Sequence, residues 1–309
     1  MLANFLSKSK PINFIILLIF FFCFYLLTVL NAFYIDGFDI DKLLKSGVLL
    51  VLFISIFFFY NFIVSKNRLT FDNSYAIFLF MLFLCFILSN TLEYKALILL
   101  ILHLLFLRKI YSLKSTKQVL QKIFDAGFLL GVSFIIEPLS IIFFILMYAG
   151  IFIHQKTTIH TILIPIVGFI SPLILYFVYL FWFDKTEDFF NLFNFLDINV
   201  FLIYTGNNII WFVGFVLLLT LLSLFIKSPK ALSVSNSFKR NWILLNINLV
   251  IALVFAMLII DKNGYEIVYL LFPTSIIIAN GVEIVKSNIA KNVVFILILV
   301  GVITHQFLL

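Results

Sequence analysis

Long apolar runs separated by short polar segments make up almost the whole chain. About 20 consecutive apolar residues can cross the roughly 30 Å hydrocarbon core of a bilayer as an α-helix. The runs bounded by charged residues predict eleven helices, at about 11–33, 46–64, 73–89, 95–108, 124–136, 139–153, 161–183, 208–226, 242–260, 267–285 and 293–308. We therefore expect an all-α fold, a polytopic transmembrane helix bundle of about 11 spans that forms a single integral membrane domain over residues 1–309.

Three of the predicted helices, at 95–108, 124–136 and 139–153, are too short to cross the core unaided. We expect them to lie in a locally thinned or protein-lined region, or two of them to form a re-entrant pair. The first helix follows Lys8 and Lys10 and in this respect resembles a signal peptide. Its apolar run is longer than a signal h-region and no small-residue cleavage pattern follows, so we expect it to remain as a transmembrane helix.

Basic residues gather on one side of this predicted topology. With the N-terminus in the cytoplasm, sixteen of the 21 Lys and Arg residues fall in cytoplasmic segments, and eleven of the 14 acids fall outside. Cytoplasmic loops of membrane proteins carry an excess of Lys and Arg, so the pattern predicts a cytoplasmic N-terminus and an external C-terminus. The net charge of +7 then reflects topology and an anionic inner leaflet, and we expect no nucleic-acid partner.

Composition and the absence of motifs exclude several classes of protein. With 64% hydrophobic and 11% charged residues, the chain has more apolar surface than a soluble domain can bury. Two cysteines inside apolar runs predict neither a disulfide framework nor a metal site. There is no Walker loop, dinucleotide fingerprint, HExxH, CxxC or GxSxG motif. The deepest ionisable residues, Asp125, Glu137 and Glu283, lie near predicted interfaces, which argues against a proton-coupled transporter.

Two connections are longer than a turn. Residues 108–124 carry five basic residues among apolar ones, which predicts a helix on the cytoplasmic interface. Residues 184–207 begin with acids and then place phenylalanines and leucines at helical spacing, which predicts an amphipathic helix on the outer surface. Each connection is either a membrane-resting connector or a partner-docking surface, and the outer one could also form a lid over a lipid-borne substrate.

Residues 66–184 resemble part of a known enzyme superfamily. This block begins KNRLTFDNSYAIFLFMLFL and later contains a basic connector followed by DAGFLLGVSFIIEPLSIIFFILMYAGIFI, with Ala126, Gly127 and Gly131 in an AGxxxGxx pattern. It is similar to the third-to-sixth helix block of polyprenyl-phosphate-sugar glycosyltransferases of the C superfamily. Small residues in close helix packing give similar patterns. The whole chain also resembles an uncharacterised family of bacterial multi-pass inner-membrane proteins, which implies the bacterial inner membrane as its location and no known activity.

The acidic stretch YIDGFDID, residues 34–41, occupies the first predicted external loop. In the glycosyltransferase superfamily an acid of this loop is catalytic, so the resemblance implies a catalytic role for Asp36 and Asp39, with a divalent cation only if the protein is an enzyme. A carboxylate there could accept the proton of an acceptor hydroxyl or help to hold that cation. This loop is much shorter than the family's loop, and a Gly between acids favours a turn. A solvated turn, a catalytic acid cluster and a partner contact are therefore the three interpretations.

Three functional hypotheses follow. As a lipid-linked sugar transferase or a degenerate relative, the protein would bring Asp36, Asp39 and Glu137 together with phosphate-binding lysines in one external cavity; the candidate lysines are Lys42, Lys45, Lys95 and Lys185. As a non-catalytic subunit of an inner-membrane complex in secretion or envelope biogenesis, it would lack such a cavity and bind other membrane proteins. A transporter would need a polar path past Asp125 or Glu283. Membrane lipids are expected partners in every case, and polyprenyl phosphate is the expected lipid of a transferase.

Overall fold

The computed structural model describes residues 2–35, 37–194, 209–231, 233, 235–259 and 264–308. These residues form helices and no β-strand. Eleven α-helices carry most of the chain: α2 (Pro11–Phe33), α3 (Ile40–Asn67), α4 (Tyr75–Phe86), α5 (Tyr94–Tyr111), α6 (Val119–Ile136), α7 (Phe144–Ile153), α8 (Ile159–Trp182), α10 (Ile209–Ala231), α11 (Asn236–Leu258), α12 (Val268–Ile284) and α13 (Asn288–Leu308). The shorter elements are α1 (Leu2–Leu6), α9 (Thr186–Asn191) and the 3-10 helices η1 (Ser89–Thr91), η2 (Ser112–Lys114), η3 (Pro138–Phe143) and η4 (Tyr265–Ile267).

Each of the eleven predicted segments corresponds to one of these long helices. Within the described part of the chain, nine helical segments are long and apolar enough to cross a membrane, and α4 and the η3–α7 segment are shorter. The protein is therefore an all-helical, multi-pass membrane protein. The span count of eleven and the orientation of the termini stay predictions.

Two of the three helices expected to be short are longer than predicted. Both α5 and α6 contain 18 residues, because α5 continues past Arg108 and Lys109 and α6 begins before Lys122. The prediction ended each helix at its first charged residue, whereas long basic side chains at a helix end can extend toward the membrane surface. The third, at 139–153, does remain short, and it is divided into η3 and α7.

The two predicted interfacial helices also differ from the structure. Residues 108–124 are not a separate helix, because they form the end of α5, then η2, and the start of α6. The outer connection contains α9, a helix of six residues, and the rest of the predicted element at 184–207 lies largely outside the described residues. Amphipathic spacing does not encode where one helix ends and the next begins, and beyond Asn191 the outer helix stays a prediction.

The chain divides into two compact units. Unit 1 contains residues 1–97, 206–234 and 263–309, and unit 2 contains residues 98–205 and 235–262. Residues 66–184 contribute to both units. This division leaves the prediction of a single membrane domain untested, because one domain can contain two compact units.

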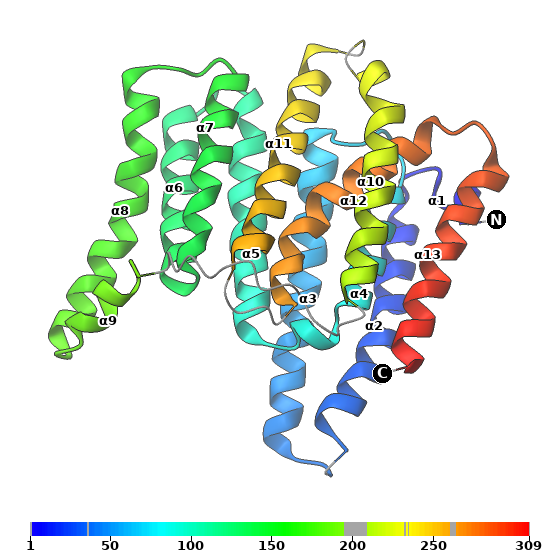
Figure 1. The fold of residues 1–309 in the computed structure, drawn as a ribbon, viewed down its shortest axis with the longest axis horizontal. Coiled ribbons are helices and arrows are strands. Elements are labelled where there is room, and N and C mark those ends of the chain that lie inside the picture. The colour runs from blue at the N-terminus through cyan, green and yellow to red at the C-terminus, as the bar shows by residue number, and fades with distance from the viewer. Residues whose placement is uncertain are drawn as a thin grey trace. The chain divides into compact units, whose positions relative to one another are not determined.

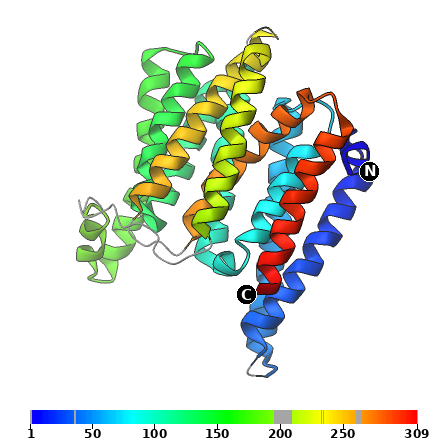
Figure 2. The same cartoon turned by 45° about the vertical axis from the view of Figure 1, so that its right-hand side comes forward.

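Unit 1 is built around α4. Every residue of α4 is buried, as expected for a helix that is apolar on all sides. In Figures 1 and 2 α4 lies beside α2 and α13, and α3 and α12 also contact it. The Tyr60 ring of α3 stacks on Phe80 of α4 at 4.0 Å, and its hydroxyl forms a 2.7 Å hydrogen bond with Ser275 of α12. These contacts join α12 to α3 and α4, which are far from it in the sequence.

Unit 2 is built around the pair α6 and α8, which lie side by side (Figure 1). Gly127 and Gly131 of α6 face the backbone carbonyls of Pro165 and Phe169 on α8, and Gly168 of α8 faces the carbonyl of Phe124. A Cβ atom at any of these glycines would overlap the opposite backbone. The AGxxxGxx pattern therefore serves close helix packing in this chain, as small residues commonly do in membrane proteins.

Candidate functional site

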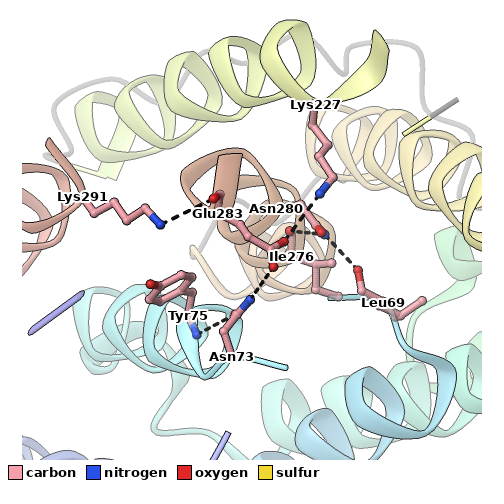
Figure 3. A network of polar contacts seen from close by, with 8 residues as sticks. All are labelled: Leu69, Asn73, Tyr75, Lys227, Ile276, Asn280, Glu283 and Lys291. Atoms are coloured by element: carbon pink, nitrogen blue, oxygen red, sulfur yellow. Dashed lines mark hydrogen bonds and ion pairs between the residues drawn. The ribbon is translucent and has the colours of Figure 1, made fainter. Parts of the chain in front are cut away.

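A polar network lies where α10 and α12 end and α13 begins, in unit 1 (Figure 3). Glu283 is at its centre. The Glu283 carboxylate lies 3.5 Å from Lys227 Nζ and accepts a 3.2 Å hydrogen bond from the Asn73 side chain. Its backbone carbonyl is 3.5 Å from Nζ of Lys291. The network therefore connects α10 and the loop between α3 and α4 to the consecutive helices α12 and α13.

Lys227 is an unusually buried cation. Only 4% of its side chain is exposed, compared with 24% for Glu283, and its ammonium also lies 4.7 Å from the centre of the Phe71 ring. A buried charge is tolerated where an opposite charge and an aromatic face compensate for lost hydration. Beside this pair, Gly281 of α12 packs directly on Ser223 of α10, so the two helices approach closely.

Asn280 fixes the connection between α3 and α4 to the same network. It is fully buried, and its side chain donates 2.9 Å hydrogen bonds to the carbonyls of Leu69 and Ile276. Arg68, which ends α3, has a left-handed backbone conformation that turns the chain toward this site. The Asn280 amide of α12 thus holds the loop between α3 and α4, which Asn73 also connects to Glu283.

The basic end of unit 1 surrounds this network. Its hydrogen bonds bring α1 to the same end, because Ala3 N–H donates to the Asn292 side chain and the Tyr75 hydroxyl donates to the carbonyl of Ala3. The basic residues that the sequence places at this end are Lys8, Lys10, Lys66, Arg68, Lys227, Lys230, Lys286 and Lys291, against the acids Asp72 and Glu283. This end therefore carries a surplus of positive charge.

Unit 2 has a basic end of its own. Lys109 of α5 pairs with Asp125 of α6 at 2.5 Å, and Arg240 of α11 donates a 3.1 Å hydrogen bond to the Gln155 side chain. Gly150 of α7 packs against side chains of α5, η2 and α11, so these elements meet at this end. The basic residues here are Arg108, Lys109, Lys114, Lys117, Lys122, Lys156, Lys239 and Arg240, against Asp125.

His154, at the end of α7, is buried within this basic end. Only 3% of its surface is exposed, and neither ring nitrogen has a hydrogen-bond partner among the described residues. Burial, together with the neighbouring charges of Arg240, Lys156 and Lys114, lowers the pKa of His154 to about 4. The imidazole is therefore neutral at physiological pH.

This lowered pKa predicts acid sensitivity. Between about pH 6.5, the ordinary value of histidine, and pH 4, the unfolded chain binds a proton at His154 that the folded chain does not. The free energy of unfolding should therefore fall as the pH is lowered through this window, by up to about 3 kcal/mol. Thermal denaturation of the purified protein between pH 4 and pH 7.5 measures this loss. His154→Phe should flatten the profile, whereas substitution of the exposed His160 should leave it unchanged, and equal profiles for both variants would contradict the assignment.

The structure places the residues predicted for the external site as follows. Asp36 lies outside the described residues. Asp39 precedes α3, where its carboxylate accepts a 3.3 Å hydrogen bond from the backbone N–H of Asp41 and so caps the helix. Lys42 and Lys45 lie in the first turns of α3, and Lys45 Nζ is 4.7 Å from the centre of the Phe33 ring.

The remaining predicted site residues are distributed over both units. Lys95, in unit 1, lies with its Nζ 5.2 Å from the centre of the Tyr265 ring. Glu137, in unit 2, is the junction between α6 and η3: its N–H donates to Ser133 and its carbonyl accepts from Ser140 N–H. No group of three or more His, Cys, Asp or Glu side chains suited to a metal occurs among the described residues. Convergence of these residues on one cavity therefore stays a prediction.

The two basic ends were predicted as a charge pattern, but the contacts within them were not. Lys227 directly follows the predicted helix 208–226 and Glu283 lies in the predicted helix 267–285, and nothing in their local sequence marks them as partners. One feature of the sequence could have indicated the pair. Lys227 and Glu283 are charged residues inside or at the end of long apolar runs, and such residues usually pair with one another. Asn73 and Asn280 gave no comparable signal.

Helix content, apolar surface and charged helix ends together define a polytopic α-helical membrane protein. Within that class, the chain belongs to a family of unknown function (DUF6427), whose model matches residues 1–308. No curated protein and no solved structure matches the chain. The family match covers the whole block in which the glycosyltransferase resemblance was noted, and it adds no support for that activity.

Proposed function

We propose that this membrane protein binds an anionic, phosphate-bearing lipid at its basic ends. One observation carries the proposal. The basic end of each unit contains eight basic residues and only one or two acids. One acid of each end already pairs with a lysine: Glu283 with Lys227 in unit 1, and Asp125 with Lys109 in unit 2. Basic residues outnumber acidic ones at both ends, so each end carries a net positive charge.

A lipid phosphate is the ligand that suits this charge. Each Lys or Arg close to an anionic membrane surface contributes about 1 kcal/mol of attraction. Hydrogen bonds from ammonium or guanidinium groups to phosphate oxygens are roughly twice as strong as neutral ones. Because the cations stand at helix ends, where headgroups are expected, the ligand can stay in the membrane while its phosphate is bound.

The proposal predicts stabilisation by the lipid. A ligand that binds only the folded protein raises its apparent stability, by about 2.7 kcal/mol when its concentration is a hundred times its Kd. We expect the midpoint of thermal denaturation to rise with phosphatidylglycerol more than with phosphatidylcholine of the same chains, and the difference to shrink at high salt. Equal midpoints with the two lipids would overturn the proposal.

Sugar transfer at the predicted external loop that contains Asp39 is a separate proposal, and Asp39→Asn tests it. Asn caps a helix about as well as Asp, so this variant should keep the stability of wild type, whereas Asp39→Ala should lose about 1 kcal/mol. If Asp39 is catalytic, Asp39→Asn abolishes transfer from a polyprenyl-phosphate sugar although the protein remains folded. If transfer by wild type and Asp39→Asn is equal, the loop residues 34–41 serve as a turn and Asp39 as a cap.

A second candidate function is a non-catalytic subunit of a larger complex in a bacterial inner membrane. The observation that favours it is the exposure of α13, of which only 17% of the apolar window is buried within the protein. Such a face contacts either lipid or another membrane protein. Gentle extraction followed by size-exclusion chromatography and mass spectrometry distinguishes the two, because a subunit would co-purify with a protein partner in fixed stoichiometry.

A further inference from the structure

An apolar groove runs along the surface of unit 2, between α11 and the η3–α7 segment. Its volume is about 460 Å³. Ile142 and Ile145 line one side, and α11 lines the other from Ile243 to Val254. Its walls are open to the surroundings, because 60% of Ile145 and 58% of Val250 are exposed. In a membrane protein such a groove faces hydrocarbon.

The length of the groove matches one leaflet of a bilayer. From Ile243 to Val254, α11 advances about 16 Å at 1.5 Å per residue. Half of a roughly 30 Å hydrocarbon core is about 15 Å. One hydrocarbon chain of a lipid in one leaflet would therefore extend along the whole groove.

Cations stand at one end of the groove. Arg240 precedes Ile243 by three residues, so the two lie on the same face of α11, one turn apart. The guanidinium donates to the side chain of Gln155, the residue before Lys156, and it has four further N–H donors. Arg240 and Lys156 are both partly exposed. A phosphate at this end would meet two positive charges.

The groove also contains one polar residue. Asn246 lies about 9 Å along α11 from Arg240, at the depth where a lipid's headgroup joins its chains. Its Oδ1 is buried and has no hydrogen-bond donor among the described residues. An unpaired buried polar atom costs about 1–3 kcal/mol, so a hydroxyl or N–H group of a bound lipid that reached this oxygen would be favoured here.

From this arrangement we infer that unit 2 holds a specific site for one anionic, phosphate-bearing membrane lipid, with the phosphate on Arg240 and Lys156 and one hydrocarbon chain in the groove. The inference rests on the proposed function and assigns the bound lipid to a defined position on unit 2. It differs from general attraction to the membrane surface, because it requires a charged end and an apolar groove that act together.

Native mass spectrometry of the purified full-length protein, with added phosphatidylglycerol or phosphatidylcholine of identical chains, tests the site. Lys156→Gln should lower the apparent affinity for phosphatidylglycerol about fivefold, as expected for one cation near a headgroup, and leave that for phosphatidylcholine unchanged. Lys262→Gln, which removes the same charge at a residue that belongs to neither basic end, should have no effect. Val250→Trp fills the groove and should weaken binding of both lipids, whereas Val178→Trp, at an equally exposed position of α8, should not.

The outcomes separate the site from the proposed function. If wild type prefers phosphatidylglycerol but each variant behaves like its control, the lipid binds elsewhere and the inference is overturned while the proposed function stands. If wild type shows no preference, both fail. Displacement of the lipid by inorganic phosphate, with Val250→Trp equal to wild type, would also overturn the inference, because only an ion site would remain.

Discussion

Glu283→Gln is expected to destabilise the protein by about 2–4 kcal/mol, more than Lys227→Met does, because the lysine is the more deeply buried partner. Without the Glu283 carboxylate, the ammonium group of Lys227 loses its negatively charged partner, although the lysine side chain is only 4% exposed to solvent. Without the ammonium, Glu283 can still reach water and keep its hydrogen bond from Asn73. Thermal or denaturant unfolding of the purified protein in detergent measures the difference.

The double variant and an exposed control complete this prediction. Combining Lys227→Met with Glu283→Gln removes both charges, so it should be more stable than Glu283→Gln alone. Lys230→Met removes an exposed charge from the same helix and should change stability by no more than about 0.5 kcal/mol. The buried charge of Lys227 is not the cause of the loss if Glu283→Gln lowers the free energy of unfolding no more than Lys230→Met does. The same holds if the double variant is the least stable of all.

Gly127→Ala and Gly168→Ala should each destabilise unit 2 by about 1–3 kcal/mol, because a single added methyl group would meet the backbone of the partner helix. A flexible side chain could move aside, whereas a backbone carbonyl can move only with its helix. The loss is therefore expected even for the smallest substitution. Unfolding measurements on the purified variants test it.

Gly214 provides the matched control. It lies on α10, and a Cβ there would have no heavy atom within 4 Å. Since Ala is favoured over Gly in a helix by about 1 kcal/mol, Gly214→Ala should be neutral or stabilising. If the three alanine variants were equally stable, close packing of α6 on α8 would not be a source of stability.

The membrane fold was largely predictable because the physical cause lies in local sequence. A run such as residues 11–33 has only one stable form in hydrocarbon, a helix that satisfies its own backbone hydrogen bonds. The ends of α5 and α6 were placed less well, because Arg108 and Lys122 can belong to a helix and still reach the membrane surface. Local sequence gives the helix, and the surroundings decide where it stops.

The candidate site could be predicted only as a distribution of charge. The positive-inside pattern placed Lys227 and Lys291 at one side, but Asn73 meets Glu283 across 210 residues of sequence, and such a contact leaves no local pattern. The glycines of 126–131 had two interpretations, a family motif and close packing, and only the contact of Gly127 with Pro165 shows the second directly. Which residues of distant helices contact one another is decided by the packing of the whole fold, so local sequence does not predict it.

The central claim is that the protein binds a phosphate-bearing lipid, and the most direct test is the lipid retained after gentle extraction from the native membrane. Mass spectrometry of the purified protein should find an anionic, phosphate-bearing lipid at fixed stoichiometry, enriched over its share of the membrane extract. A protein that retains no lipid, or one whose retained lipids mirror the membrane composition, would contradict the claim.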